Sequence, residues 1–90
     1  MEVKEFIGEK VVYDELGQVI WGVDSDGGHQ RIADIRGWGA IQNLFKTKDG
    51  LIDEDKAAIF QDELGKWIAD AINEKLQRER IGNILKQYEN

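Results

Sequence analysis

The chain has 90 residues, of which 41% are hydrophobic and 33% charged, and its formal net charge is -6. A chain of this length has room for one hydrophobic core, so we expect a single domain over residues 1–90. The absence of cysteine excludes disulfides and sulfur-ligated metals, and a negative chain without a basic stripe is a poor candidate for binding duplex nucleic acid.

Residues 3–36 are expected to form the β part, with about three antiparallel strands joined as hairpins. The first hairpin spans residues 10–23, and Gly17 provides the positive φ that its turn needs. The acidic and glycine-rich segment 24–28 forms the second turn, and residues 30–36 form the third strand.

Alternation within these strands predicts which side chains face the core. Three apolar side chains share one face of the second strand: Val19, Trp21 and Val23. This face is therefore expected to be the strongly apolar one. In the third strand, Ile32 and Ile35 cannot share a face unless a bulge occurs near Ala33 and Asp34.

Residues 38–89 are expected to be helical, with a short helix after Trp38 and one long amphipathic helix capped by Asp53. The long helix carries one apolar stripe, made of Ala57, Phe60, Leu64, Trp67, Ile68, Ala71, Ile72 and Leu76. We expect the β layer and Trp38 to seal this stripe. The fold class is thus α+β, with antiparallel hairpins packed on a short helix and a long C-terminal helix.

Two glycines interrupt the long helical pattern. A glycine costs roughly 1 kcal/mol relative to alanine inside a helix. Gly65 therefore predicts close packing of another side chain, such as a tryptophan of the sheet, against its backbone. Gly82, followed by Asn83, is expected to end the helix, which leaves an apolar tail from Ile81 to Tyr88.

Residues that commonly carry catalysis or bind metals form no specific constellation. His29 is the only histidine, whereas a structural zinc site takes four histidine or cysteine ligands. The carboxylates of the long helix lie at its exposed start and outer face, although general acid catalysis requires a carboxylate in an apolar pocket. We therefore expect a protein that is not an enzyme and has no metal and no cofactor.

Two surfaces are candidate binding sites. The first is the strand-to-helix junction of Arg36, Gly37, Trp38 and Gly39. Its guanidinium and helix-opening amides would hold an anionic nucleotide, and its tryptophan would stack on a ring. Alternatively, Arg36 pairs with Asp34 and Trp38 belongs to the core. The second is an acidic surface that would stand in for phosphates, made of Asp49, Asp53, Glu54, Asp55, Asp62 and Glu63.

The residues from 36 to 73 carry a resemblance to a known group of proteins. The motif is Arg36-Gly37-Trp38-Gly39-x-Ile41-Gln42, followed by Gln61-Asp62-x-x-Gly65-x-x-Ile68-x-x-Ala71-Ile72-Asn73. This pattern resembles one found in small uncharacterised phage and prophage proteins. The resemblance implies a phage or prophage origin and a cytoplasmic location, and it assigns no activity and no catalytic residue.

The sequence therefore predicts a non-enzymatic interaction protein whose acidic residues cover a host protein surface. The alternative is a protein that binds a nucleotide at the junction of Arg36 to Gly39. We expect a homo-oligomer, because small domains without disulfides often gain burial by association and the apolar tail offers surface. No apolar run approaches the roughly 20 residues that span a bilayer, and the acidic N-terminus lacks the features of a signal peptide. We thus expect no membrane association and a cytoplasmic location.

Overall fold

The computed structural model describes residues 2–36 and 38–88 of the chain. Its elements in order are α1 (Val3–Ile7), β1 (Lys10–Asp14), β2 (Val19–Val23), β3 (His29–Asp34), α2 (Gly39–Leu44) and α3 (Glu54–Tyr88). The expected α+β class, with antiparallel hairpins and a long C-terminal helix, is confirmed. The expected start of the β part at residue 3 is wrong. Residues 3–7 form the helix α1, and Gly8 then turns the chain with a φ of 97°.

The strands form one antiparallel sheet in the order β1, β2, β3, so β1 and β3 are its edges. The expected bulge is present. Trp21 is opposite Arg31 and Ile20 is opposite Ala33, so Ile32 is the extra residue. The bulge explains why the apolar spacing of β3 slips, because Ile32 packs against the core cluster while Ile35, directly after the strand, is also fully buried.

The turn between β1 and β2 differs from the expected one. The residue with positive φ is Gln18, at 53°, and not Gly17. The carboxylate of Asp14 accepts a hydrogen bond from the backbone N–H of Leu16 at 3.0 Å. An aspartate side chain that bonds the backbone two residues ahead sets up the turn locally, so the position of the glycine does not decide it.

The core cluster lies on the Ile20 face of β2, opposite to the face that alternation predicts, although Val19 of the predicted face is buried as well. Ile20 is fully buried, whereas Trp21 faces the other way, with the guanidinium carbon of Arg31 at 5.4 Å from its ring centre. The reason is Gly22, where a Cβ would collide with the carbonyl oxygen of Ile7. The absence of a side chain at Gly22 therefore lets α1 cover this face.

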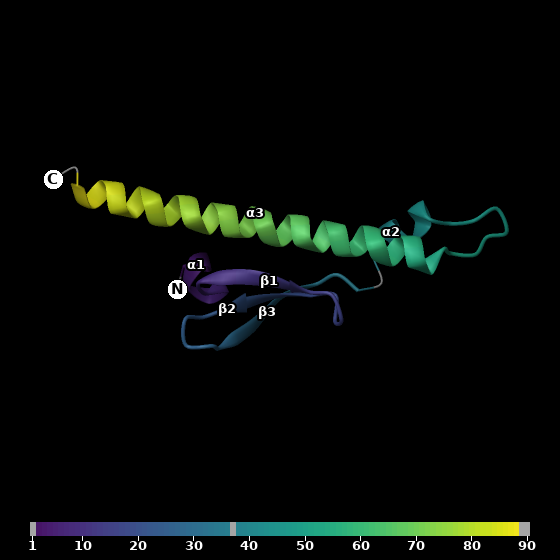
Figure 1. The fold of residues 1–90 in the computed structure, drawn as a ribbon, viewed down its shortest axis with the longest axis horizontal. Helices are drawn as coiled ribbons and strands as arrows, with labels where there is room; N and C mark the ends of the chain where they lie inside the picture. Colours follow the sequence, from purple (N-terminus) through teal and green to yellow (C-terminus); the bar gives the residue numbers. More distant parts are fainter. Residues whose placement is uncertain (1, 37, 89–90) are drawn as a thin grey trace.

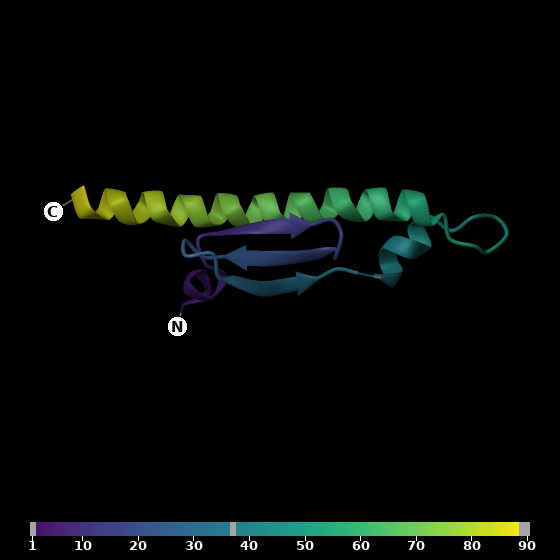
Figure 2. The ribbon, with the colours of Figure 1, turned by 60° about the horizontal axis from the view of Figure 1, so that its bottom comes forward.

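Helix α3 lies along the edge strand β1, on the same side of the sheet as α1 (Figures 1 and 2). Its buried residues are Ala57, Gln61, Gly65, Ala69 and Leu76. Most of them are small and recur every four residues, so the helix backbone approaches the sheet closely. The expected stripe is therefore only partly right: Ala57 and Leu76 are buried, and Ile68 and Ile72 pack against the core cluster. Trp67, in contrast, is 70% exposed.

Helix α2 packs beside the first turns of α3, where the rings of Phe45 and Phe60 have centres 5.6 Å apart. Ile41 is the buried residue of α2. Trp38 precedes the helix with an extended backbone and is 41% exposed, so the expectation that it seals α3 is wrong. A helix of six residues presents only one row of side chains to its neighbour, and Ile41 occupies that row.

The molecule is elongated because α3 is much longer than the sheet. Its extents are 65 × 25 × 18 Å and its radius of gyration is 17.2 Å, compared with about 12 Å for a compact chain of this length. The 35 residues of α3 span about 52 Å, whereas a strand of five residues spans roughly 17 Å. The expected helix end at Gly82 and Asn83 is wrong, since α3 continues through both to Tyr88.

Candidate interaction surface

Gly65 marks the closest approach of α3 to the sheet. A Cβ there would overlap the ring of Tyr13, so the expected close packing exists, but its partner is a tyrosine and not a tryptophan. The hydroxyl of Tyr13 donates a hydrogen bond to Asp62 Oδ1 at 2.7 Å. Burial, and secondly this hydrogen bond, raise the pKa of Tyr13 well above its ordinary value.

Two amide side chains of α3 bond backbone groups of the sheet region. Asn73 Oδ1 accepts from the N–H of Val11 at 2.7 Å, and Asn73 Nδ2 donates to the carbonyl of Val11 at 2.9 Å. The buried Gln61 donates to the carbonyl of Ile35. Buried backbone groups require such partners, so these contacts fix both the rotation and the position of α3. One face of the helix is therefore committed to the sheet.

The opposite face of α3 carries a line of side chains spaced alternately by three and four residues. We call it the α3 seam, and it consists of Leu64, Trp67, Ala71, Glu74, Arg78, Ile81, Leu85 and Tyr88. At 100° per residue, its centre lies roughly 150° around the helix from the buried row. Ile81 is 49% exposed, Leu85 57% and Tyr88 83%. In Figures 1 and 2, no other described element runs along this side of the helix.

The middle of the α3 seam is charged. Glu74 and Arg78 lie one turn apart and form an ion pair, and both side chains are largely exposed. The seam is therefore apolar towards both of its ends and carries one acid and one base between them.

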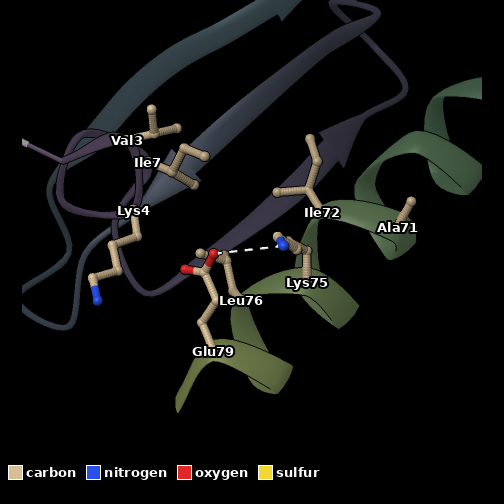
Figure 3. A pocket seen from close by; sticks show the side chains of 8 residues that line it. All are labelled: Val3, Lys4, Ile7, Ala71, Ile72, Lys75, Leu76 and Glu79. Atoms are coloured by element: carbon tan, nitrogen blue, oxygen red, sulfur yellow. Dashed lines mark ion pairs between the residues drawn. The ribbon is translucent and has the colours of Figure 1, made fainter. Parts of the chain in front are cut away.

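A groove of about 420 Å³ lies on the other flank of α3, against α1. Figure 3 shows Ile7 of α1 facing the side of Ile72 and Leu76, with Lys75 and Glu79 at the rim as an ion pair of 3.8 Å. The polar groups that line it are lysine and glutamate side chains in contact with solvent. The groove thus offers an apolar surface with an ion pair at its rim.

The predicted nucleotide junction is occupied by its own ion pair. The guanidinium of Arg36 donates three hydrogen bonds of 2.7–3.1 Å to the carboxylate of Asp34. These bonds lower the pKa of Asp34 to about 2. Gly37 lies outside the described residues, and Gly39 begins the six-residue α2. The geometry therefore matches the alternative interpretation of Arg36, and nucleotide binding stays a prediction.

The six acidic residues of the second candidate site lie in two parts of the chain, the start of α3 with the loop before it and the third turn of α3. Four of them lie in the loop before α3 and in its first turn: Asp49, Asp53, Glu54 and Asp55. Asp53 is the expected N-cap, since its carboxylate accepts from the N–H of Lys56 at 3.2 Å. Asp62 turns towards the sheet to bond Tyr13, while Glu63 is exposed. Asp62 is thus engaged within the fold, and an acidic interaction surface formed by the other positions stays a prediction.

Among residues 2–36 and 38–88, no group of three or more acidic or histidine side chains is placed to hold a metal ion. Within the same residues, no helix combines the length and the apolar character needed to cross a bilayer. Comparisons with models of protein families, with curated proteins and with solved structures find no match to this chain.

The α3 seam is the surface that the sequence reasoning missed. Its signal was present, because alternate spacings of three and four residues run from Leu64 to Tyr88. However, Leu64, Trp67 and Ala71 were assigned to the stripe expected beneath the sheet. The expected helix end at Gly82 also separated Leu85 and Tyr88 from the rest of the line.

Proposed function

We propose that this chain is a non-enzymatic interaction protein of phage or prophage origin, and that its α3 seam is the surface that binds another protein. The observation that carries the proposal is the row of apolar side chains on the uncovered face of α3, with Trp67 and Tyr88 the most exposed. Exposed apolar side chains gathered on one helix face, as at both ends of this seam, are typical of an interaction site, and tryptophan and tyrosine are the residues that most often dominate such sites.

The length of α3 supports the same proposal. No residue of α3 beyond Leu76 is buried among those described. Twelve further residues continue as helix, and their contacts within the chain are limited to the N-terminal part, such as the hydrogen bond from Arg80 to the carbonyl of Glu9. An isolated helix of that length is marginal in water. A partner packed along the seam would supply the missing apolar contacts and stabilise this end.

The acidic residues have a smaller part in the proposal. Those in the loop and first turn, such as Asp49 and Glu54, gather at one end of the elongated molecule (Figure 1). Charges at the rim of an interface speed association and select partners more than they add affinity. They would thus favour a partner that is basic beside its apolar contact.

Capture experiments with two charge-introducing variants test the proposal. Trp67→Glu places a charge in the centre of the seam, and Leu16→Glu places the same charge on a fully exposed leucine in the turn between β1 and β2. We expect the wild-type chain and Leu16→Glu to retain the same proteins from an extract of bacteria that express this chain, and Trp67→Glu to lose them. Retention should persist at about 0.5 M salt, because screening weakens surface charge pairs and leaves apolar contacts intact.

Equal capture by all three chains would contradict the role of the seam. Release at about 0.5 M salt would instead favour binding through the acidic end, since exposed charges are then screened.

A further inference from the structure

We infer that the partner of the α3 seam is a second copy of this chain, packed antiparallel against the same seam. This inference rests on the proposed function and names the partner. It follows from the spacing of the seam, from the place of its two charges and from what covers each side of α3.

The seam has the spacing of a two-stranded coiled coil. Alternate steps of three and four residues give an average repeat of 3.5, which keeps one line of side chains facing a partner helix. The line runs for three and a half heptads, from Leu64 to Tyr88, and only Glu74 and Arg78 depart from apolar character. A seam of this length, roughly 36 Å, is long enough for stable pairing.

The two charges select the antiparallel orientation. In a parallel pair, Glu74 would lie against the partner's Glu74, and Arg78 against the partner's Arg78. In an antiparallel pair centred near Leu76, Glu74 lies opposite the partner's Arg78, and the same contact occurs again by symmetry. Like charges at the centre of an interface repel, whereas opposite charges attract. The existing ion pair between Glu74 and Arg78 would then join a ring of four alternating charges.

The same register matches the apolar positions. Leu64 lies opposite the partner's Tyr88, Trp67 opposite the partner's Leu85, and Ala71 opposite the partner's Ile81. Each pair thus joins a smaller and a larger apolar side chain, as interdigitated packing requires. The pairing also alternates the two kinds of heptad position across the interface, which is how antiparallel coiled coils pack.

The fold leaves room for this partner. The partner's helix would end opposite Leu64, so it would not reach Phe60, which already contacts Phe45. Each sheet lies on the far side of its own helix (Figures 1 and 2). An aromatic side chain buries about 150–250 Å², and each chain adds Trp67, Tyr88 and the aliphatic seam residues. The total therefore reaches the order of 1,200 Å² that a specific interface needs.

Cysteine cross-linking tests the register, because the chain has no cysteine of its own. We expect an oxidised mixture of Ala71→Cys and Ile81→Cys chains to give the cross-linked heterodimer. Ala71→Cys alone should not cross-link, since in the antiparallel pair the two copies of that position are about 15 Å apart along the axis, beyond the roughly 7 Å that a disulfide allows. Efficient cross-linking of Ala71→Cys with itself would overturn the antiparallel arrangement.

Charge reversal tests the centre of the seam. Glu74→Arg alone places four like charges together, so the dimer dissociation constant should rise on the order of tenfold or more. Adding Arg78→Glu should restore the dissociation constant towards the wild-type value. Helix content measured by circular dichroism serves as the control for both variants. If the double variant is as weak as Glu74→Arg, the proposed pairing is wrong.

The molar mass separates this inference from the proposed function. Light scattering at about 100 µM should give twice the chain mass of 10.3 kDa for the wild type. It should give the single mass for Trp67→Glu. A wild-type monomer that still captures another protein through Trp67 would overturn the second copy and leave the proposed function standing. A monomer that captures nothing would overturn both.

Discussion

Two glycines of α3 should differ in their effect on stability, because they have different neighbours. At Gly65 an added Cβ would meet the ring of Tyr13, whereas at Gly82 it would meet nothing within 4 Å. Gly65→Ala should therefore destabilise the protein by about 1–3 kcal/mol, because the collision outweighs the gain in helix propensity. Gly82→Ala should instead stabilise it by up to about 1 kcal/mol. Urea unfolding followed by tryptophan fluorescence measures both changes.

A double variant checks the cause of this difference. In a Tyr13→Ala background the ring is absent, so Gly65→Ala should no longer destabilise. A loss that stays the same in both backgrounds would mean that the ring of Tyr13 is not what requires glycine at this position.

Tyr13 also predicts a dependence of stability on pH. Because burial and the bond to Asp62 raise its pKa in the folded state, the unfolded chain releases this proton at lower pH than the folded one. The contribution of Tyr13 is therefore complete below pH of about 10, the ordinary tyrosine pKa, and is lost as pH rises further. The free energy of unfolding should fall more steeply above that pH in the wild type than in Tyr13→Phe.

The pH dependence of stability must be compared between the wild type and Tyr13→Phe, because Lys66 also affects stability at high pH. Its hydrogen bond to Glu15 raises the pKa of its ammonium group, so it too contributes stability that is lost at high pH. Lys66 is present in both chains, and only the difference between them reports on Tyr13. Parallel curves for wild type and Tyr13→Phe would contradict the assigned role of the hydroxyl.

At the level of elements, Asn73 joins the middle of α3 to the free edge of β1. Its amide bonds both backbone groups of Val11. Asn73→Leu leaves these two groups without partners, so we expect a loss of about 2–4 kcal/mol. Gln77→Leu, an exposed position one turn further on, should change stability by less than about 0.5 kcal/mol.

Hydrogen exchange of the Val11 amide tells whether the contact itself is lost. This amide should exchange faster in Asn73→Leu and at the wild-type rate in Gln77→Leu. Unchanged exchange at Val11 in both variants would show that Asn73 does not hold the edge of the sheet.

The elements themselves could largely be predicted from the sequence. Apolar alternation indicated β1 to β3, the slipped spacing of β3 indicated a bulge, and Asp53 indicated where α3 begins. The orientation of α3 could not be predicted, because the helix carries two apolar faces and periodicity does not tell which one meets the sheet. Gly65 indicates the correct face, because the small residues in its row mark the side of α3 that packs closest to the sheet.

The candidate site was predictable only in part for the same reason. The expected sites relied on residue type, namely an arginine beside glycines and a set of carboxylates. Arg36 is bound by Asp34, and Asp62 by Tyr13. Such pairings join residues whose proximity depends on a turn or on the docking of α3. The seam is likewise defined by its position opposite the buried row of α3, and that position depends on how α3 docks on the sheet.

For the whole molecule, the central feature is a helix much longer than the sheet it covers. The sheet holds residues 61–76 of α3 through Gly65, Asn73 and their neighbours. No residue from 77 to 88 is fully buried, and the contacts of this segment are with the N-terminal part of the chain, where Arg80 donates to the carbonyl of Glu9. An elongated monomer would thus have one stable half of α3 and one half that frays. Association along the seam removes this difference, because it covers both halves.

Hydrogen exchange of α3 at two protein concentrations tests this account most directly. At about 100 µM, we expect residues 77–88 to be protected along with residues 61–76, and dilution to about 1 µM should weaken protection of residues 77–88 first. Trp67→Glu should leave residues 77–88 unprotected at both concentrations. Fast exchange of residues 77–88 in the wild type at about 100 µM, equal to that of Trp67→Glu, would contradict the account.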